Sequence, residues 1–230
     1  MTPRDRILDA AMTVFRRHGF RRSSIEQAAE AAGLTRQALY HHFKSKEALF
    51  RALIERLYEN ALDAEIAAAN TKEKEGCGLA DILVAQVTAR FTFLIASLEG
   101  SPHIEELFSE HLVHARDLYQ KYAGVYAAQG VATIERIRRK QKLVLAIAPG
   151  ELWRYVEMAV NGAKSAHPKM QPAGAFFKDL EIMLRTLIAG AIGASPKPRS
   201  VKPRPAKKSS RKRPSTPRRP FSPKRPGDRK

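Results

Sequence analysis

Cysteine is almost absent from the chain: among 230 residues only Cys77 occurs. A single cysteine cannot form an intrachain disulfide, so the sequence is typical of a protein of the reducing cytosol. Cys77 lies between Gly76 and Gly78 in an expected loop. There it is either a redox-sensitive thiol or a residue without a special role.

Long apolar runs and a leader are also missing. No apolar run approaches the roughly 20 residues that a bilayer-spanning helix needs. The chain opens with Arg4, Asp5 and Arg6, which do not fit a signal peptide. These absences predict a cytoplasmic protein without a membrane partner.

Motifs of catalysis and metal binding are missing as well. No Ser/His/Asp or Cys/His set, phosphate-binding glycine loop or zinc spacing occurs, so no enzyme, catalytic residue or cofactor is predicted. One group at helical spacing offers metal-ligand chemistry: Glu106, Glu110, His111 and His114. Apolar residues define the core side of this helix, so Glu106, Glu110 and His114 are expected on a solvated face and no metal is predicted. The apolar residues are Ile104, Leu107, Phe108 and Leu112.

The most informative segment that is present covers residues 23–43. Ser24 and Gln27 have the spacing of a capping box, which predicts the start of a helix. Gly33 stands where that helix must stop and turn, a position that favours a residue tolerant of positive φ. Thr35 can cap a second short helix. The segment therefore predicts two helices around a turn.

The second of these helices has a polar outer face. Leu39 and Phe43 fall on its inner side, and the outward residues are Arg36, Gln37, Tyr40, His41 and Lys44. A short helix that projects such side chains from a helix-turn-helix suits the major groove of DNA. An ordinary helical hairpin with a solvated face is the alternative.

Residues 4–53 together resemble the DNA-binding domain of the tetracycline-repressor (TetR) family. The residues that carry the resemblance are Ile7 to Ala11, Phe15, Gly19-Phe20, Ser24-Ile25, Ala29, Ala32 to Leu34, Leu39-Tyr40, Phe43 and Ser45 to Leu49. Members of that family are typically homodimeric, all-helical transcriptional regulators whose variable second domain senses a small molecule. The resemblance therefore implies a repressor that binds a palindromic operator and is released by an effector.

The resemblance also implies roles in DNA binding. Arg36 and Gln37 would reach base edges, Ala38 would lie near the groove floor, and Tyr40 and Lys46 would hold phosphates. The full set of expected DNA-binding residues is Ser24, Ile25, Thr35, Arg36, Gln37, Ala38, Tyr40, His41, Lys44 and Lys46.

The rest of the chain is expected to be helical up to about residue 192, without strand alternation. The expected helices cover residues 46–70, 79–98, 149–163 and 173–192, and a further helix opens at Pro102. A long segment follows the helix that opens at Pro102 and continues to about Lys142, with a bend near Gly124 or Gly130. An effector pocket between these helices is predicted from aromatic and apolar residues, namely Phe91, Phe108, Leu112, Tyr122, Tyr126 and Trp153. By resemblance, the last two helices form the dimer interface, through Val156, Val160, Phe176, Leu180, Leu184 and Leu187. Buried packing within the chain would give the same apolar pattern.

Charge is concentrated at the C-terminal end. The chain carries a net charge of +18, and residues 195–230 hold 15 Lys or Arg, one acid and nine Pro. Proline and like charges oppose folding, so this tail is expected to be disordered and to bind DNA phosphates without reading bases. A solubilising extension and a mimic of a nuclear-localisation signal are alternative readings of the tail.

The sequence thus predicts an all-α protein in three parts: residues 1–50, a three-helix helix-turn-helix DNA-binding domain; residues 51–194, a helical effector-binding and dimerisation domain; and residues 195–230, a disordered basic tail. The predicted partners are double-stranded DNA with a palindromic operator, a second copy of the chain and a small-molecule effector. Two other functions stay open. One is an architectural, nucleoid-associated DNA binder driven by the tail, and the other is a protein-interaction module placed by DNA binding.

Overall fold

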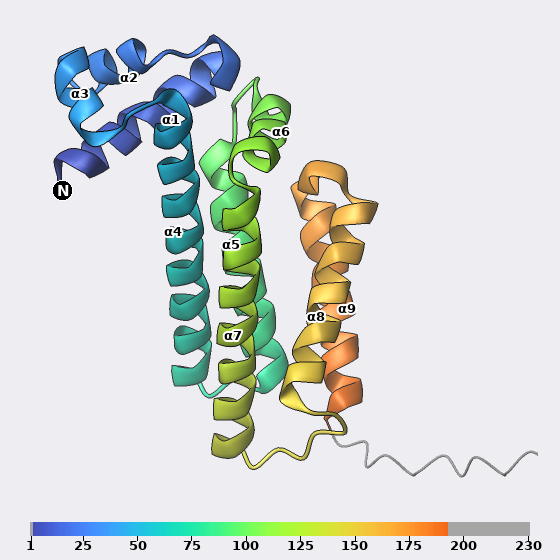
Figure 1. The fold of residues 1–230 in the computed structure, drawn as a ribbon. Coiled ribbons are helices and arrows are strands. Elements are labelled where there is room, and N and C mark those ends of the chain that lie inside the picture. The colour runs from blue at the N-terminus through green and yellow to red at the C-terminus, as the bar shows by residue number, and fades with distance from the viewer. Residues whose placement is uncertain (1, 193–230) are drawn as a thin grey trace, which may run out of the picture. The chain divides into compact units, whose positions relative to one another are not determined.

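The computed structural model describes residues 2–192 of the chain (Figure 1). Within this range the chain is helical and contains no strand, apart from one antiparallel bridge between Leu145 and Ile192. The helices are α1 (Pro3–Arg22), α2 (Ile25–Ala31), α3 (Arg36–His42), α4 (Lys46–Lys74), α5 (Leu79–Leu98), α6 (Ile104–His114), α7 (Arg116–Lys140), α8 (Pro149–Ala166), the short 3-10 turn η1 (Pro168–Met170) and α9 (Ala173–Ala191). The all-α fold is confirmed. The predicted basic tail lies outside the described residues.

The helix-turn-helix forms from the local signals that its sequence contains. The Ser24 hydroxyl accepts the Gln27 N–H, and the Gln27 side chain accepts the Ser24 N–H at 2.8 Å, which completes the capping box of α2. At the end of α2 the Leu34 N–H bonds to the Ala29 carbonyl. Gly33 adopts φ +68° in this turn, the left-handed conformation that ends many helices.

Aromatic side chains hold α1 to the start of α4. The ring centroid of Phe50 lies 5.3 Å from that of Phe15 and 4.7 Å from that of Phe20. Leu39 of α3 is fully buried in the same cluster, so the short helix α3 is fixed from its inner side. Leu107 of α6 also belongs to this cluster. The core of the N-terminal helices therefore extends beyond residue 50.

The remaining helices share a second core. Figure 1 shows α4, α5 and α7 running alongside one another, with α8 and α9 as a pair at one edge. Trp153, Phe176 and Phe91 are the largest buried side chains of this core, in which α5 packs against α4, α7 and α9. Gly130 of α7 lies directly against the Trp153 ring, where a Cβ atom would collide with it.

The bend expected near Gly124 or Gly130 is wrong. Helix α7 is continuous through both glycines, and the break lies at Ala115, which has φ −137° and ψ 25°. Ala115 is fully buried, so the turn between α6 and α7 is packed tightly. The glycine at position 130 serves helix packing, which the sequence pattern alone does not distinguish from a bend.

Helix α5 corrects a second expectation. Its mean hydropathy is 1.6 over 18 residues, so it alone among the helices of residues 2–192 is long and apolar enough to cross a membrane. In this structure 44% of that window is buried inside the protein. A helix surrounded by other helices needs an apolar surface all round, which gives it the same composition as a spanning helix. The expectation that no segment approaches this composition was wrong.

Candidate DNA-binding surface and ligand cavity

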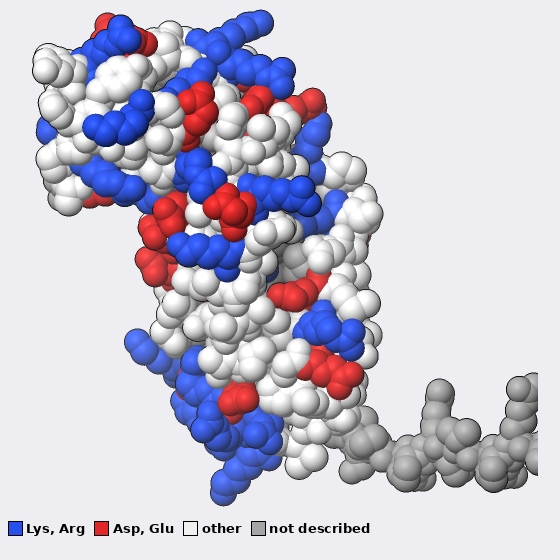
Figure 2. Space-filling view, in the orientation of Figure 1, with Lys and Arg blue, Asp and Glu red and all other residues white. Residues whose placement is uncertain are grey.

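Helix α3 presents a polar face to solvent. Arg36, Gln37, His41 and Lys44 are exposed, while Leu39 beneath them is fully buried. Figure 2 shows Lys and Arg side chains spread over the N-terminal helices. The Thr35 hydroxyl accepts the Ala38 N–H at 3.2 Å and so fixes the start of α3. Tyr40 and Ala38 are half-buried at the edge of this face.

Arg36 is positioned by two neighbours. Its Nε atom lies 2.9 Å from Oε1 of Glu26 on α2, and its guanidinium lies 5.4 Å from the centre of the Tyr40 ring. The Arg36 side chain is nevertheless 65% exposed. An exposed ion pair contributes only about 0–1 kcal/mol, so Arg36 can leave Glu26 for a stronger acceptor.

Two of the expected DNA-binding residues have other positions in the structure. The Ile25 side chain is 5% exposed and packs in the N-terminal core, so it cannot reach DNA. The Lys46 ammonium donates to the carbonyl oxygens of Phe20 and Ser23, both at 3.0 Å. It also lies 4.5 Å from the centre of the Phe20 ring. Lys46 therefore joins the start of α4 to the end of α1 and does not project to solvent. Ser24 is half-buried as the cap of α2.

The expectation that Glu106, Glu110 and His114 face solvent is wrong. The Arg21 backbone N–H donates to Oε1 of Glu106 at 2.6 Å, and Nε of Arg21 donates to Oε1 of Glu110 at 2.7 Å. Nε2 of His114 lies 3.1 Å from the other oxygen of Glu110, which is only 6% exposed. We call this group the α1–α6 contact. It joins α6 to the end of the helix that precedes the helix-turn-helix.

Gly19 makes room for the α1–α6 contact. It has φ +76° inside α1, a conformation that residues with a side chain rarely adopt. A Cβ atom at this position would overlap the Glu106 carboxylate. The His114 ring packs from the other side, with its centroid 4.9 Å from that of Phe20. Backbone conformation and close approach both require glycine here.

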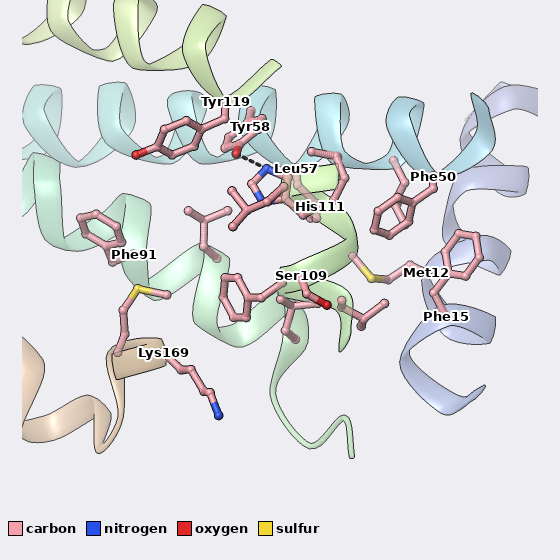
Figure 3. Close-up of a pocket in the computed structure, with 18 of the residues that line it drawn as sticks. Met12, Phe15, Phe50, Leu57, Tyr58, Phe91, Ser109, His111, Tyr119 and Lys169 are labelled. Carbon is pink, nitrogen blue, oxygen red and sulfur yellow. Dashed lines mark hydrogen bonds between the residues drawn. The ribbon is translucent and has the colours of Figure 1, made fainter. Parts of the chain in front are cut away.

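A large apolar cavity lies beside this contact. Its volume is about 420 Å³, within the usual range for small-molecule sites. Figure 3 shows that it extends from Met12 and Phe15 of α1 to Phe91 of α5, with Tyr58 and His111 between them. Its other lining residues are Phe50, Leu53, Ile54, Leu57, Leu94, Leu98, Leu107, Phe108, Ser109, Leu112, Tyr119, Lys164, Lys169 and Met170.

A hydrogen bond crosses the middle of the cavity wall. The Tyr58 hydroxyl lies 2.5 Å from Nε2 of His111 (Figure 3). Burial lowers the pKa of His111 below its ordinary value, with a smaller contribution from the charge of Lys164. Burial also raises the pKa of Tyr58. Both side chains are therefore neutral at neutral pH, with the hydroxyl donating to the ring nitrogen.

A smaller polar cavity of about 180 Å³ adjoins the apolar one. Five residues line both of them: Tyr58, Phe91, Leu94, Tyr119 and Lys164. The wall of the smaller cavity includes Arg90, which is 7% exposed and lies 3.2 Å from the fully buried Glu65 carboxylate. Burial raises the pKa of Glu65 to about 7, and the charge of Arg90 opposes this shift.

The residues expected in the effector pocket separate into three groups. Phe91, Phe108 and Leu112 line the apolar cavity, and Tyr126 lines the smaller one. Tyr122 lines neither and stacks on Tyr58, with ring centroids 5.0 Å apart. Trp153 also lines neither, because its ring is part of the second core against α7. Met12 and Phe15 also line the apolar cavity but are not among the predicted pocket residues, because they belong to the N-terminal domain.

The residues expected at a dimer interface lie inside the chain. Val156, Val160, Phe176, Leu180 and Leu184 are at most 5% exposed and form part of the second core. Leu187 is half-buried against the same cluster. Helices α8 and α9 use these apolar faces to pack against each other and against the body. Five of the six predicted side chains are therefore buried within a single chain, and the dimer interface itself stays a prediction.

Comparison with known proteins identifies the N-terminal part. Residues 7–53 match the family model described as bacterial regulatory proteins, tetR family. A protein of Mycobacterium tuberculosis named as an HTH-type transcriptional repressor is 27% identical over 164 residues, which are 69% of this chain and 79% of that protein. The transcriptional regulator UidR of Escherichia coli is 42% identical over 59 residues, or 26% of this chain and 30% of UidR.

Solved structures share the fold of the whole helical body. A TetR-family regulator from Rhodococcus sp. superimposes with a TM-score of 0.58 and 19% identity, over 83% of this chain and 98% of that one. SmeT, described as the repressor of a Stenotrophomonas maltophilia multidrug efflux pump, superimposes with a TM-score of 0.55 and 22% identity, over 85% of this chain and 96% of SmeT. At these identities the likeness shows the fold. Residues 7–53 are thus a domain of the tetR family of bacterial regulatory proteins, and the described body has the fold of solved TetR-family regulators.

Proposed function

We propose that this protein is a cytoplasmic repressor that binds a palindromic operator as a homodimer and releases it when a small molecule fills the apolar cavity. The observation that carries the proposal is the cavity wall, which includes residues of α1, α4 and α6. Helix α1 supports the helix-turn-helix, so a ligand would contact the DNA-binding domain itself. The exposed polar face of α3 supplies the surface that reads DNA.

The proposed switch acts through α6. Phe108 and His111 on this helix line the cavity, while Glu106 and Glu110 on the same helix hold the end of α1. A ligand that displaces the cavity-facing side chains therefore also displaces the α1–α6 contact. The two recognition helices of a dimer must fit successive major grooves, so a shift of either domain lowers operator affinity.

The proposed dimer uses the outer face of α8 and α9. Met158 and Ile182 are large apolar residues that are 57% and 54% exposed on these two helices. Gly162, Thr186 and Ala189 are small exposed residues on the same helices, which permit close approach of a second copy. A two-fold axis through this face would relate two α3 helices, as a palindromic site requires.

The test of DNA reading compares Arg36→Ala with Lys44→Ala on an operator selected from random duplexes. Arg36→Ala should weaken operator binding by about 1–3 kcal/mol, the usual contribution of an arginine that pairs with guanine. The same variant should scarcely change binding to random duplex. Lys44→Ala should weaken both duplexes alike, because phosphates carry no sequence information. An equal loss on both duplexes for Arg36→Ala would remove its role in base reading.

The test of the switch uses Glu110→Gln, with Glu105→Gln as control. A compound that fills the cavity should lower operator affinity by about 5–150-fold, the usual range of allosteric coupling. Glu110→Gln loses the charge that holds Arg21 and should reduce this factor several-fold. Glu105 lies on the same helix but pairs with Lys169, so its variant should keep the factor. Compounds that raise Tm without changing DNA affinity would contradict the switch.

A further inference from the structure

The ammonium group of Lys164 lies where the apolar and polar cavities meet. It is 5.0 Å from the centre of the Phe91 ring, and within residues 2–192 no carboxylate forms an ion pair with it. Burial and, to a smaller extent, the charge of Arg90 together lower the pKa of Lys164 to about 8. At neutral pH this lysine is therefore mainly protonated, and no carboxylate of the described residues pairs with its positive charge.

Lys164 has no ion-pair partner of its own within residues 2–192. Arg90 forms an ion pair with Glu65 at 3.2 Å. Glu157 also lines the polar cavity, where its Oε1 accepts the Trp153 indole N–H at 3.0 Å, but it forms no ion pair with Lys164 and its charge is not among those that shift the Lys164 pKa. Nε of Arg90 is buried and has no hydrogen-bond partner among the described residues. A half-buried unpaired lysine and an unused buried donor beside the same cavity favour a bound anion.

The surroundings of this point restrict the rest of the ligand. On one side the wall consists of Phe91, Leu94 and Phe108 and continues to Phe50 and Phe15, without a second unpaired cation among the lining residues that the structure describes. Lys169, the other lysine of the wall, forms an ion pair with Glu105. Figure 3 shows its amino group pointing away from the aromatic cluster. The ligand should thus be charged at one end only.

We propose that the cavity binds an apolar monocarboxylic acid, with its carboxylate between Lys164 and Arg90 and its hydrocarbon part along Phe91 toward α1. This inference names the chemical class of the proposed effector and so rests on the cavity's role in the proposed function. A monoanion suits the single lysine of the wall that has no ion-pair partner in the described part of the chain, and the aromatic and aliphatic wall disfavours a second charged group.

The test compares three probes of equal chain length on the full protein: decanoic acid, decan-1-ol and decylamine. Calorimetry or displacement of a fluorescent dye gives each Kd. The acid should bind about tenfold or more tightly than the alcohol, because charge-assisted hydrogen bonds form only with the carboxylate. The amine should bind most weakly, because it adds a like charge beside Lys164. Equal affinities for acid and alcohol, or no binding of any probe, would overturn the proposal.

Matched variants locate the head group. Lys164→Met should lower the affinity for decanoic acid to that for decan-1-ol and leave the affinity for decan-1-ol within about twofold. Lys169→Met removes the other lysine of the wall and should preserve the preference for the acid. Lys164→Met removes a poorly compensated charge, so its Tm should not fall below that of the wild type. A preference that survives Lys164→Met would place the head group elsewhere and refute the assignment.

The pH dependence gives an independent readout. The titratable and charged groups that face Lys164 are Tyr58 and Glu65 on α4, Arg90 on α5, His111 on α6, Tyr119 and Tyr126 on α7, and Glu157 on α8. Burial lowers the pKa of His111 and raises that of Tyr126, so neither titrates just above neutral pH. Glu65 has a pKa of about 7, so it loses its proton at the lower limit of the pH range in which Lys164 titrates.

Bound acid stabilises the protonated lysine, so the complex holds the Lys164 proton more tightly than the free protein. The affinity for the acid is therefore highest below pH 8, the approximate pKa of Lys164 in the ligand-free protein, and it falls as the pH rises above that value. The expected loss approaches about tenfold per pH unit between about pH 8 and pH 9.5. Decan-1-ol should show no such loss, and neither should the acid with Lys164→Met. A flat profile for the wild-type protein would contradict the ion pair.

Operator binding separates this inference from the proposed function. If decanoic acid binds through Lys164 and also weakens operator binding, both are supported. If it binds through Lys164 but operator affinity is unchanged, the ligand class is supported and the effector role fails. If other compounds release the operator while decanoic acid does not bind, the effector role is supported and the ligand class is wrong.

Discussion

Leu180→Glu should unfold the helical body, whereas Ile182→Glu, two residues further on, should leave it folded and separate the proposed dimer. Leu180 is fully buried in the second core, and Ile182 is 54% exposed on the same helix. An unpaired charge in a packed core costs several kcal/mol. That cost is comparable with the roughly 5–15 kcal/mol by which a whole domain is stable.

The measurement is thermal unfolding by circular dichroism together with light scattering. Ile182→Glu should give a monomer of normal helical content that has lost operator binding, and Met158→Glu on α8 should act in the same way. Leu180→Glu should lose helical content at the growth temperature or melt far below the wild type. A folded, dimeric Ile182→Glu protein would move the interface away from the outer face of α8 and α9.

Gly19→Ala should be the most damaging small substitution in the N-terminal domain. Gly19 combines φ +76° with ψ 170°, a region that is almost restricted to glycine. The strain of a residue with a side chain there is about 1–3 kcal/mol. The new methyl group would also overlap the Glu106 carboxylate, which must move away from Arg21. Stability and the α1–α6 contact should both suffer.

Gly33→Ala is the matched control for this substitution. Gly33 also has a positive φ, but a Cβ atom there would meet nothing within 4 Å. Gly33→Ala should therefore lower the free energy of unfolding by only about 1 kcal/mol, because alanine must adopt the left-handed backbone conformation. Unfolding midpoints in urea should fall clearly further for Gly19→Ala than for Gly33→Ala. Equal losses would show that Glu106 moves aside without cost and that the α1–α6 contact is weak.

Much of the fold could be predicted from the sequence because its signals are local. The capping residues Ser24, Thr35 and Ser45 begin their helices as predicted, since each bonds to an N–H only three residues away. The limits 79–98 for α5 also agree with the prediction, because Gly78 and Gly100 bound an apolar run. A short helix between two caps needs little information from distant residues.

The residues of the proposed dimer interface could not be predicted in this way. An apolar stripe shows that one side of a helix is buried but not what covers it. The stripe of α9 that contains Phe176 and Leu184 is covered by α5 and α8 of the same chain. The outer side of α9 carries Ile182 as an isolated large apolar residue. A single apolar residue does not form a periodic pattern that could be recognised in the sequence. The choice between the two faces depends on tertiary packing.

The α1–α6 contact was missed for a related reason. The sequence predicts Glu110 on a solvated face because the apolar residues of this helix define a different side as the core side. The partner of Glu110 is Arg21, which lies 89 residues earlier in the chain, and nothing in the sequence indicates that the two meet. The same holds for Lys164, whose position beside Phe91 and Arg90 depends on how α8 packs against α5. Long-range charge pairs require the three-dimensional structure.

Leu107 of α6 is part of the hydrophobic core that surrounds Phe15 and Phe50. The N-terminal helices and the rest of the helical body are consequently not interchangeable modules. A chimera that joined residues 1–50 to the body of another regulator would receive a foreign side chain at this point, and with it a cavity or a steric clash. Recombination of operator preference with a new inducer should therefore succeed only when the α6 residue that enters the N-terminal core is transferred as well.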